Sequence, residues 1–158
     1  MNGEWTTVEI AAHRAEAYDP LGASPPRFGV LHLHEVGLKT LRDRPAFTRL
    51  FDELNLACIC PHGGPCWWTD RICTEFDPRI TPEKYLLQKV LPYFKNRWRL
   101  ESPAIGLLGV GMGGQGALRL AFKRPDLFPV VAGIAPSIEY HELYGHGTPI
   151  DEMYVERS

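Results

Sequence analysis

The chain of 158 residues is long enough for one domain with a substantial core, and its 44% hydrophobic and 23% charged residues are an ordinary globular composition. Its formal net charge of −2 gives no general electrostatic reason to expect nucleic acid or an anionic membrane as a partner. The N-terminus lacks a basic-then-apolar signal pattern, and no apolar run approaches a membrane span, so we expect a cytoplasmic protein.

Hydrophobic periodicity predicts strands that alternate with helices along the chain. In chain order these are a strand or hairpin over 6–18, a strand over 28–33, a helix over 46–55, a strand over 56–60, a helix over 82–98, a strand over 104–110, a helix over 113–124 and a strand over 128–135. We expect Pro92 to kink its helix or remove a hydrogen bond, and 138–158 stays unassigned. The alternation predicts an α/β fold, with a mostly parallel sheet and helices on both faces.

The most informative motif is Gly109-Val110-Gly111-Met112-Gly113, between a predicted strand and a predicted helix. This is the setting of the G-x-S-x-G turn, in which a strained serine is exposed above the carboxyl edge of a parallel sheet. Here glycine stands at the serine position. Because glycine has no hydroxyl, Gly111 cannot form an acyl-enzyme.

Two groups of residues in the sequence are candidates for metal ligation. Cys58, Cys60 and His62 would share one face of a strand, but zinc knuckle spacings are missing, and we interpret the cysteines as small buried side chains. His141 and His146 are five residues apart with a glycine between them, so they would not share a helical face. We therefore expect neither a metal nor a cofactor.

Four ordered segments carry a resemblance to a known family. They are 31–37, 61–70, Tyr85 with 91–94, and the block from Gly109 to Phe128. Together they resemble the esterase D-like family of the α/β-hydrolase superfamily, over roughly residues 28–137. The resemblance implies the α/β-hydrolase fold and a carboxylic-ester hydrolase, in which serine attacks the ester carbonyl, histidine transfers the proton and an acid orients the histidine.

The resemblance also implies site residues. Gly111 occupies the nucleophile position, the Met112 N–H is one oxyanion donor, and Glu35, where the family has glycine, supplies a possible second. His34, Trp67, Trp68 and Gln115 are the candidate substrate-binding residues. Two alternatives stay open: the tryptophans could be aromatic packing under a long loop, and the turn could be a plain strand-to-helix connection.

The family's acid and histidine follow the nucleophile, each after a later strand. Only one strand is predicted after Gly111, and no strand pattern places His141 or His146 in a triad. We therefore expect 1–158 to be a single α/β-hydrolase-like domain, incomplete at its C-terminus and without turnover. The alternatives are a pseudo-esterase that binds an acyl or saccharide ligand, or a half-domain completed by a partner: a homo-oligomer or a missing C-terminal segment would then cover the open sheet edge.

Overall fold

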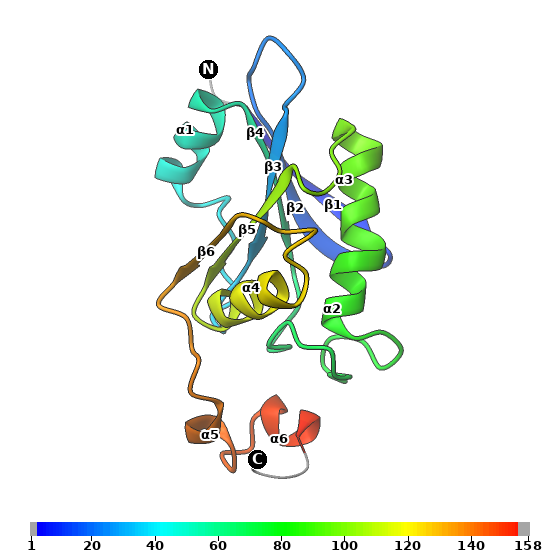
Figure 1. Cartoon of the computed structure of the whole chain (residues 1–158), viewed down its shortest axis with the longest axis vertical. Coiled ribbons are helices and arrows are strands. Elements are labelled where there is room, and N and C mark those ends of the chain that lie inside the picture. Colours follow the sequence, from blue (N-terminus) through cyan, green and yellow to red (C-terminus); the bar gives the residue numbers. More distant parts are fainter. Residues whose placement is uncertain (1–2, 155–158) are drawn as a thin grey trace.

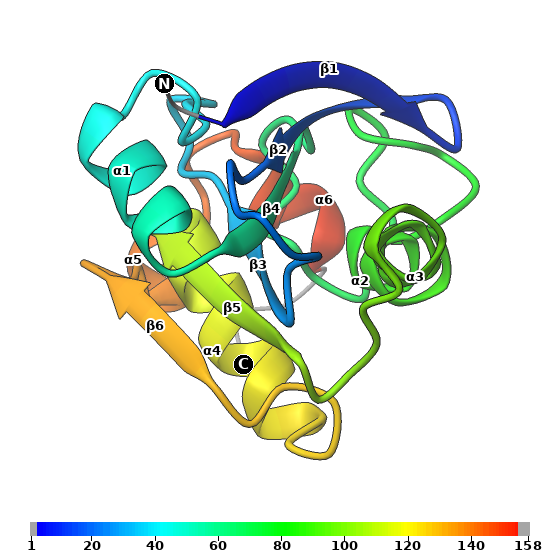
Figure 2. The same cartoon turned by 90° about the horizontal axis from the view of Figure 1, so that it is seen from above.

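The computed structural model describes residues 3–154, so Ser158, the end of the predicted domain, lies outside the described residues. A six-stranded sheet runs through the molecule in the order β1-β2-β4-β3-β5-β6 (Figures 1 and 2). Its strands are β1 (Glu4–Ile10), β2 (His13–Asp19), β3 (Phe28–Leu33), β4 (Leu56–Pro61), β5 (Ile105–Val110) and β6 (Val131–Ile134). Strands β4, β3, β5 and β6 are parallel, and the β1–β2 hairpin joins them antiparallel through β2. The mostly parallel sheet is therefore confirmed.

Helices cover both faces of the sheet, as the alternation predicts (Figure 2). Helix α1 (Pro45–Glu53) lies on one face, over a cluster that includes Tyr18, Phe51, Cys58 and Cys60. The other face carries α2 (Pro82–Tyr85), a π-helical turn (Leu86–Val90), α3 (Leu91–Trp98) and α4 (Met112–Lys123), over the larger core cluster. The short helices α5 (Tyr140–Leu143) and α6 (Pro149–Met153) lie beyond the carboxyl edge of the sheet (Figure 1).

The helix predicted over 82–98 is interrupted by the π-helical turn, and Pro92 explains why. The Leu91 N–H donates to the Leu86 carbonyl, five residues back, which closes the wider turn. Pro92 then falls in the first turn of α3, where a backbone N–H needs no helical partner. The structure thus accommodates the proline by a local π turn.

Strand β6 is shorter than the predicted 128–135. Phe128 is buried and its N–H donates to the Arg124 carbonyl, so it belongs to the turn that ends α4. The next residue, Pro129, has no N–H to give to a sheet ladder. Within residues 3–154 no helix has the length and apolar character needed to cross a membrane.

Candidate functional site

Strand β5 passes into α4 through a tight turn at Gly111, whose φ of 54° and ψ of −116° lie where residues with side chains are rarely found. The Gly111 N–H donates to the Ile134 carbonyl at 2.9 Å, and the Gly111 carbonyl accepts from the N–H groups of Gln115 and Ser137, each at 3.1 Å. These bonds tie β5, β6 and α4 together. The turn therefore holds residue 111 in a fixed place at the carboxyl end of β5.

The glycines on either side of residue 111 are required by close packing. A Cβ added to Gly109 would lie 2.0 Å from the Gly113 carbonyl oxygen, and one added to Gly113 would lie 1.9 Å from the Leu33 carbonyl oxygen. A Cβ at Gly111 would meet only the Glu35 Cβ, at 3.3 Å. Position 111 thus has room for a side chain if Glu35 shifts by a few tenths of an ångström, and its positive φ also favours glycine.

The structure places both predicted oxyanion residues beside Gly111. Glu35 packs against it from the loop after β3, and the Glu35 carboxylate accepts from the Gly37 N–H at 3.0 Å. Met112 opens α4, so its N–H belongs to the first turn, where backbone donors lack a partner within the helix. The positive end of the α4 dipole also points toward this turn. Met112 and Glu35 are therefore both neighbours of Gly111.

His34 is fully buried and both of its ring nitrogens are engaged. The Gly63 N–H donates to Nε2 at 2.9 Å, so Nε2 is unprotonated and Nδ1 donates to the Glu35 carbonyl at 2.8 Å. Burial lowers the pKa of His34 to about 4, so the ring is neutral at neutral pH. His34 therefore braces the Glu35 loop against the loop that begins at Gly63.

Trp67 and Trp68 also pack beneath this site, and both are buried with positive φ. The Trp68 indole N–H donates to the His34 carbonyl at 3.2 Å, while the Trp67 N–H lies 3.3 Å from the Met112 sulfur. The Arg119 guanidinium donates to the Trp68 carbonyl and pairs with the buried carboxylate of Glu83 at 2.5 Å. The tryptophan pair thus fixes the loop to α4 and to the oxyanion residues.

Gln115 stands apart from this group. Its side chain lines a cavity of about 490 Å³ together with Leu118, Phe122 and Ile138, on the outer side of α4. Glu35 lines a different cavity, next to Gly111. The structure thus brings His34, Glu35, Trp67, Trp68 and Met112 into one cluster around residue 111, while the Gln115 side chain faces elsewhere.

The cavity next to Gly111, here called the Gly111 cavity, has a volume of about 200 Å³. His32, Lys39 and Arg44 contribute its remaining ionisable groups, and no sequence motif indicates any of them. They come from β3 and from the loop before α1, at no spacing that a motif would show. Only their position around the carboxyl edge of the sheet brings them together.

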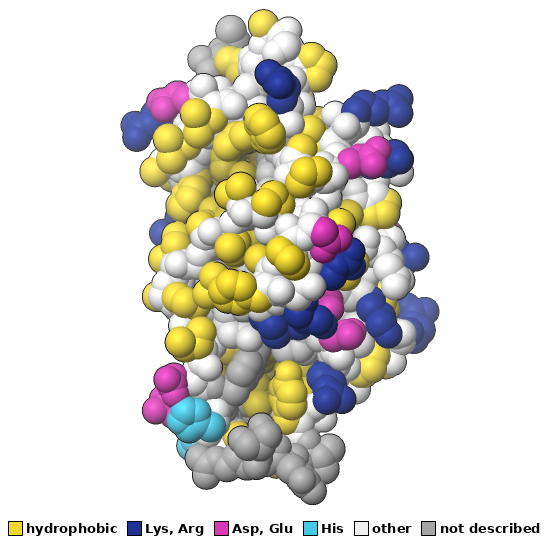
Figure 3. Space-filling model, viewed as in Figure 1, with side chains coloured by type: hydrophobic (Ala, Val, Ile, Leu, Met, Phe, Trp, Pro, Cys, Tyr) yellow, Lys and Arg dark blue, Asp and Glu magenta, His cyan; other side chains and the backbone are white. Residues whose placement is uncertain are grey.

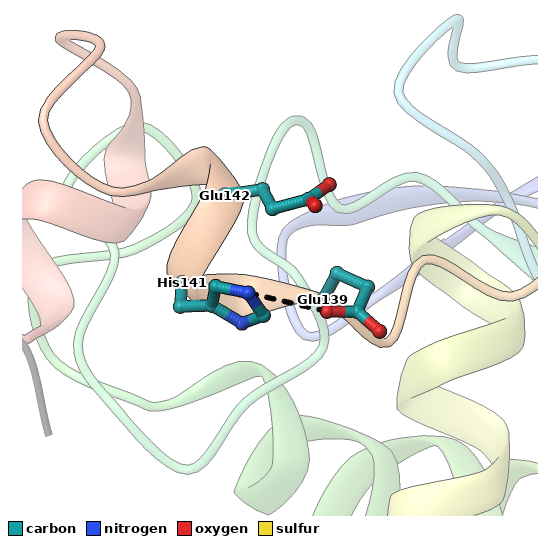
Figure 4. A group of neighbouring side chains, drawn as sticks. All are labelled: Glu139, His141 and Glu142. Atoms are coloured by element: carbon teal, nitrogen blue, oxygen red, sulfur yellow. Dashed lines mark ion pairs between the residues drawn. The ribbon is translucent and has the colours of Figure 1, made fainter.

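Two places in the structure gather possible metal ligands: the Cys58–Cys60 pair, and a cluster at α5 that contains His141 but not the other candidate, His146. Cys58 and Cys60 are buried free thiols with their sulfurs 3.8 Å apart, which confirms the interpretation of small buried side chains. Burial raises the pKa of the Cys58 thiol. At α5, Glu139, His141 and Glu142 place one ligand atom each within 4.8 Å of one another, and His141 pairs with Glu139 at 3.3 Å (Figure 4). All three are exposed to water, where such groups are common without an ion, and we assign no metal to them.

The family profile described as "Putative esterase" matches residues 67–153, just over half of the chain. The chain belongs to this esterase family. The matched segment contains the Trp67–Trp68 loop, the Gly111 turn and α4. The expected esterase-type hydrolase relationship is therefore confirmed at the level of the family. No curated protein matches the chain.

Solved structures of esterases and serine hydrolases share the fold. The S-formylglutathione hydrolase of Agrobacterium tumefaciens superposes with a TM-score of 0.67 at 18% identity, covering 85% of this chain and 57% of its own. A ferulic acid esterase gives 0.72 at 16% identity, covering 96% and 65%. The fluorophosphonate-binding serine hydrolase F of Staphylococcus aureus gives 0.76 at 15% identity, covering 100% and 68%. The chain thus spans roughly three fifths to two thirds of the length of these structures.

The part of the chain that the structure describes after β6 forms only α5 and α6. His141 is paired with Glu139, and the Asp151 carboxylate accepts from the N–H groups of Gly145 at 2.7 Å and Gly147 at 2.8 Å. These bonds shape the segment around α5 and α6. Within residues 3–154, no histidine and acid therefore follow a strand after β6, where the fold family carries them.

Proposed function

We propose that the chain is an ester-binding member of the esterase family that does not form an acyl-enzyme. One observation carries the proposal: residue 111 occupies the turn of a serine nucleophile, with room for a side chain, but has no hydroxyl. A serine there would attack the ester carbonyl, and the N–H groups of Met112 and Glu35 would stabilise the oxyanion. With Gly111 those donors can still hold a carbonyl oxygen, but no covalent bond forms.

We expect the natural chain to resist labelling by a fluorophosphonate probe and to show no saturable hydrolysis of p-nitrophenyl acetate, since both reactions need an activated nucleophile. Intact-protein mass spectrometry and absorbance at the nitrophenolate band measure the two. An active serine esterase is the positive control. Labelling, or saturable turnover that heat denaturation removes, would overturn the absence of an acyl-enzyme.

The binding half of the proposal has a separate readout. Calorimetric titration with small acyl esters and with acylated saccharides is expected to give heat for at least one ester, because carbonyl binding by the proposed Met112 and Glu35 donors needs no hydroxyl at residue 111. If no small acyl ester and no acylated saccharide gives measurable heat, the result would contradict an ester-binding role. The chain would then keep the fold of the family without its ligand site.

A second copy of the chain is the partner that we propose for the open side of the molecule. Strand β6 forms one edge of the sheet, and hydrophobic side chains gather over β6 and α4 in Figure 3. Phe122 is 80% exposed, Val130 67% and Ile138 64%. An uncovered strand edge beside such a surface favours association, and two β6 edges can pair with each other about a two-fold axis.

Sedimentation velocity is expected to show reversible self-association that rises with concentration, and a Phe122→Ser/Ile138→Ser variant is expected to stay monomeric. Leu54→Ser, which removes a 63% exposed side chain at the end of α1, is the matched control and should associate like the natural chain. A monomer at every concentration would contradict the second copy. That result would favour another segment or protein as the covering partner.

A further inference from the structure

The Gly111 cavity adjoins the turn through two of its own lining residues. Glu35 and Ile134 both line it, and both contact Gly111: a Cβ at 111 would lie 3.3 Å from the Glu35 Cβ, and the Gly111 N–H donates to the Ile134 carbonyl at 2.9 Å. Leu41, Phe47 and Val110 complete an apolar wall. A group attached to a carbonyl carbon at Gly111 can therefore extend into this cavity.

His32 lies in the wall of the Gly111 cavity and is only 1% exposed. Both of its ring nitrogens are shielded from solvent, and the Cys60 side chain hydrogen-bonds to the ring. His32 therefore contributes the surface of its ring to the cavity wall, and the polar partners of a ligand must come from other residues of the lining.

Two cations stand over the same cavity. Lys39 and Arg44 line it, both side chains are exposed, and neither forms an ion pair among the residues that the structure describes. The carboxylate of Glu35, the acidic group in the lining, is already held by the Gly37 N–H at 3.0 Å. The charge around the cavity is thus positive on balance, which attracts an anion.

We propose that the Gly111 cavity binds a carboxylate on a short acyl chain, so that the esters held at Gly111 are half-esters of small dicarboxylic acids. The carboxylate site rests on the proposed function in one respect, the position of the ester carbonyl at Gly111. A volume of about 200 Å³ is large enough for a chain of two methylenes and a carboxylate. The methylenes lie along the apolar wall, and the carboxylate pairs with Lys39 and Arg44.

The test compares two nearly isosteric esters, monomethyl succinate and methyl levulinate, in which a methyl group replaces one carboxylate oxygen. NMR titration of the natural chain is expected to show about tenfold tighter binding of monomethyl succinate, from the added charge-assisted hydrogen bonds. Lys39→Gln/Arg44→Gln is expected to lose this preference and still bind methyl levulinate as before. Arg27→Gln/Lys84→Gln removes two exposed cations elsewhere and should keep the preference.

The outcomes separate this inference from the proposed function. Equal binding of the two esters to the natural chain, or a preference that survives in Lys39→Gln/Arg44→Gln, overturns the carboxylate site while ester binding stands. Equally tight binding of monomethyl succinate and free succinate, with no binding of methyl levulinate, supports the carboxylate site and overturns the ester-binding function. Inorganic phosphate binding as tightly as succinate would overturn the assignment to a carboxylate on an acyl chain.

Discussion

Gly113→Ala is expected to lower the free energy of unfolding by about 4 kcal/mol or more and to leave little folded protein, because its Cβ would lie 1.9 Å from the Leu33 carbonyl oxygen and 2.6 Å from that of His34. Both contacts are backbone atoms, so the first turn of α4 must move away from β3. Urea denaturation followed by tryptophan fluorescence measures the loss.

The matched control is Gly111→Ala, two residues earlier in the same turn. Its Cβ would meet the Glu35 Cβ at 3.3 Å, which a shift of a few tenths of an ångström relieves, and the main cost is the strain of a side chain at positive φ, about 1–3 kcal/mol. Similar losses in the two variants would contradict this account of the turn. The contrast matters because, of the three glycines at 109, 111 and 113, only Gly111 stands where a side chain would avoid a backbone clash.

Local sequence patterns were sufficient to predict the layers of this fold. Apolar runs such as 28–33 predicted the buried parallel strands, and the glycine spacing at 109–113 predicted the tight turn. Each is a local signal, because one residue and its near neighbours decide it. The local structure at Pro92 was harder to predict. A helix can compensate for the missing proline N–H by a kink or by a π-helical turn, and the choice depends on what the helix packs against.

The rest of the site depends on contacts between residues far apart in the chain. Glu83 pairs with Arg119 and, at 2.6 Å, with Lys123, and this cluster holds the Trp68 loop to α4. Nothing near Glu83 in the sequence indicates these partners. His32 likewise resembles an ordinary strand residue until the sheet brings it to the Gly111 cavity. Such side chains are found only when the topology is known.

Stability is expected to fall by about 3 kcal/mol as the pH is lowered from 6.5 to 4, because His34 must stay neutral in the folded protein. Burial lowers its pKa to about 4 from an ordinary value of 6.5, so between these values the unfolded chain binds a proton that the folded chain does not. The stabilisation is complete above pH 6.5 and is lost as the pH falls. Urea denaturation across this range measures the slope.

His34→Gln is expected to flatten this part of the profile, whereas His141→Gln, which changes a side chain that is 58% exposed, should leave it as in the natural chain. Equal slopes in the natural chain and in His34→Gln would contradict the assignment. If His34→Gln does not fold, NMR titration of the natural chain gives the His34 pKa directly, and a value near 6.5 would be the contrary result.

Protonation of His34 is also expected to affect the residues around the Gly111 turn. A protonated Nε2 can no longer accept from the Gly63 N–H, so the bond that braces the Glu35 loop is lost while Glu35 still packs against Gly111. The Glu35 loop carries the proposed oxyanion donor and also forms part of the wall of the Gly111 cavity. Ester binding should therefore weaken over the same pH range as stability, and weaken before the protein unfolds, because the loop opens before the sheet does.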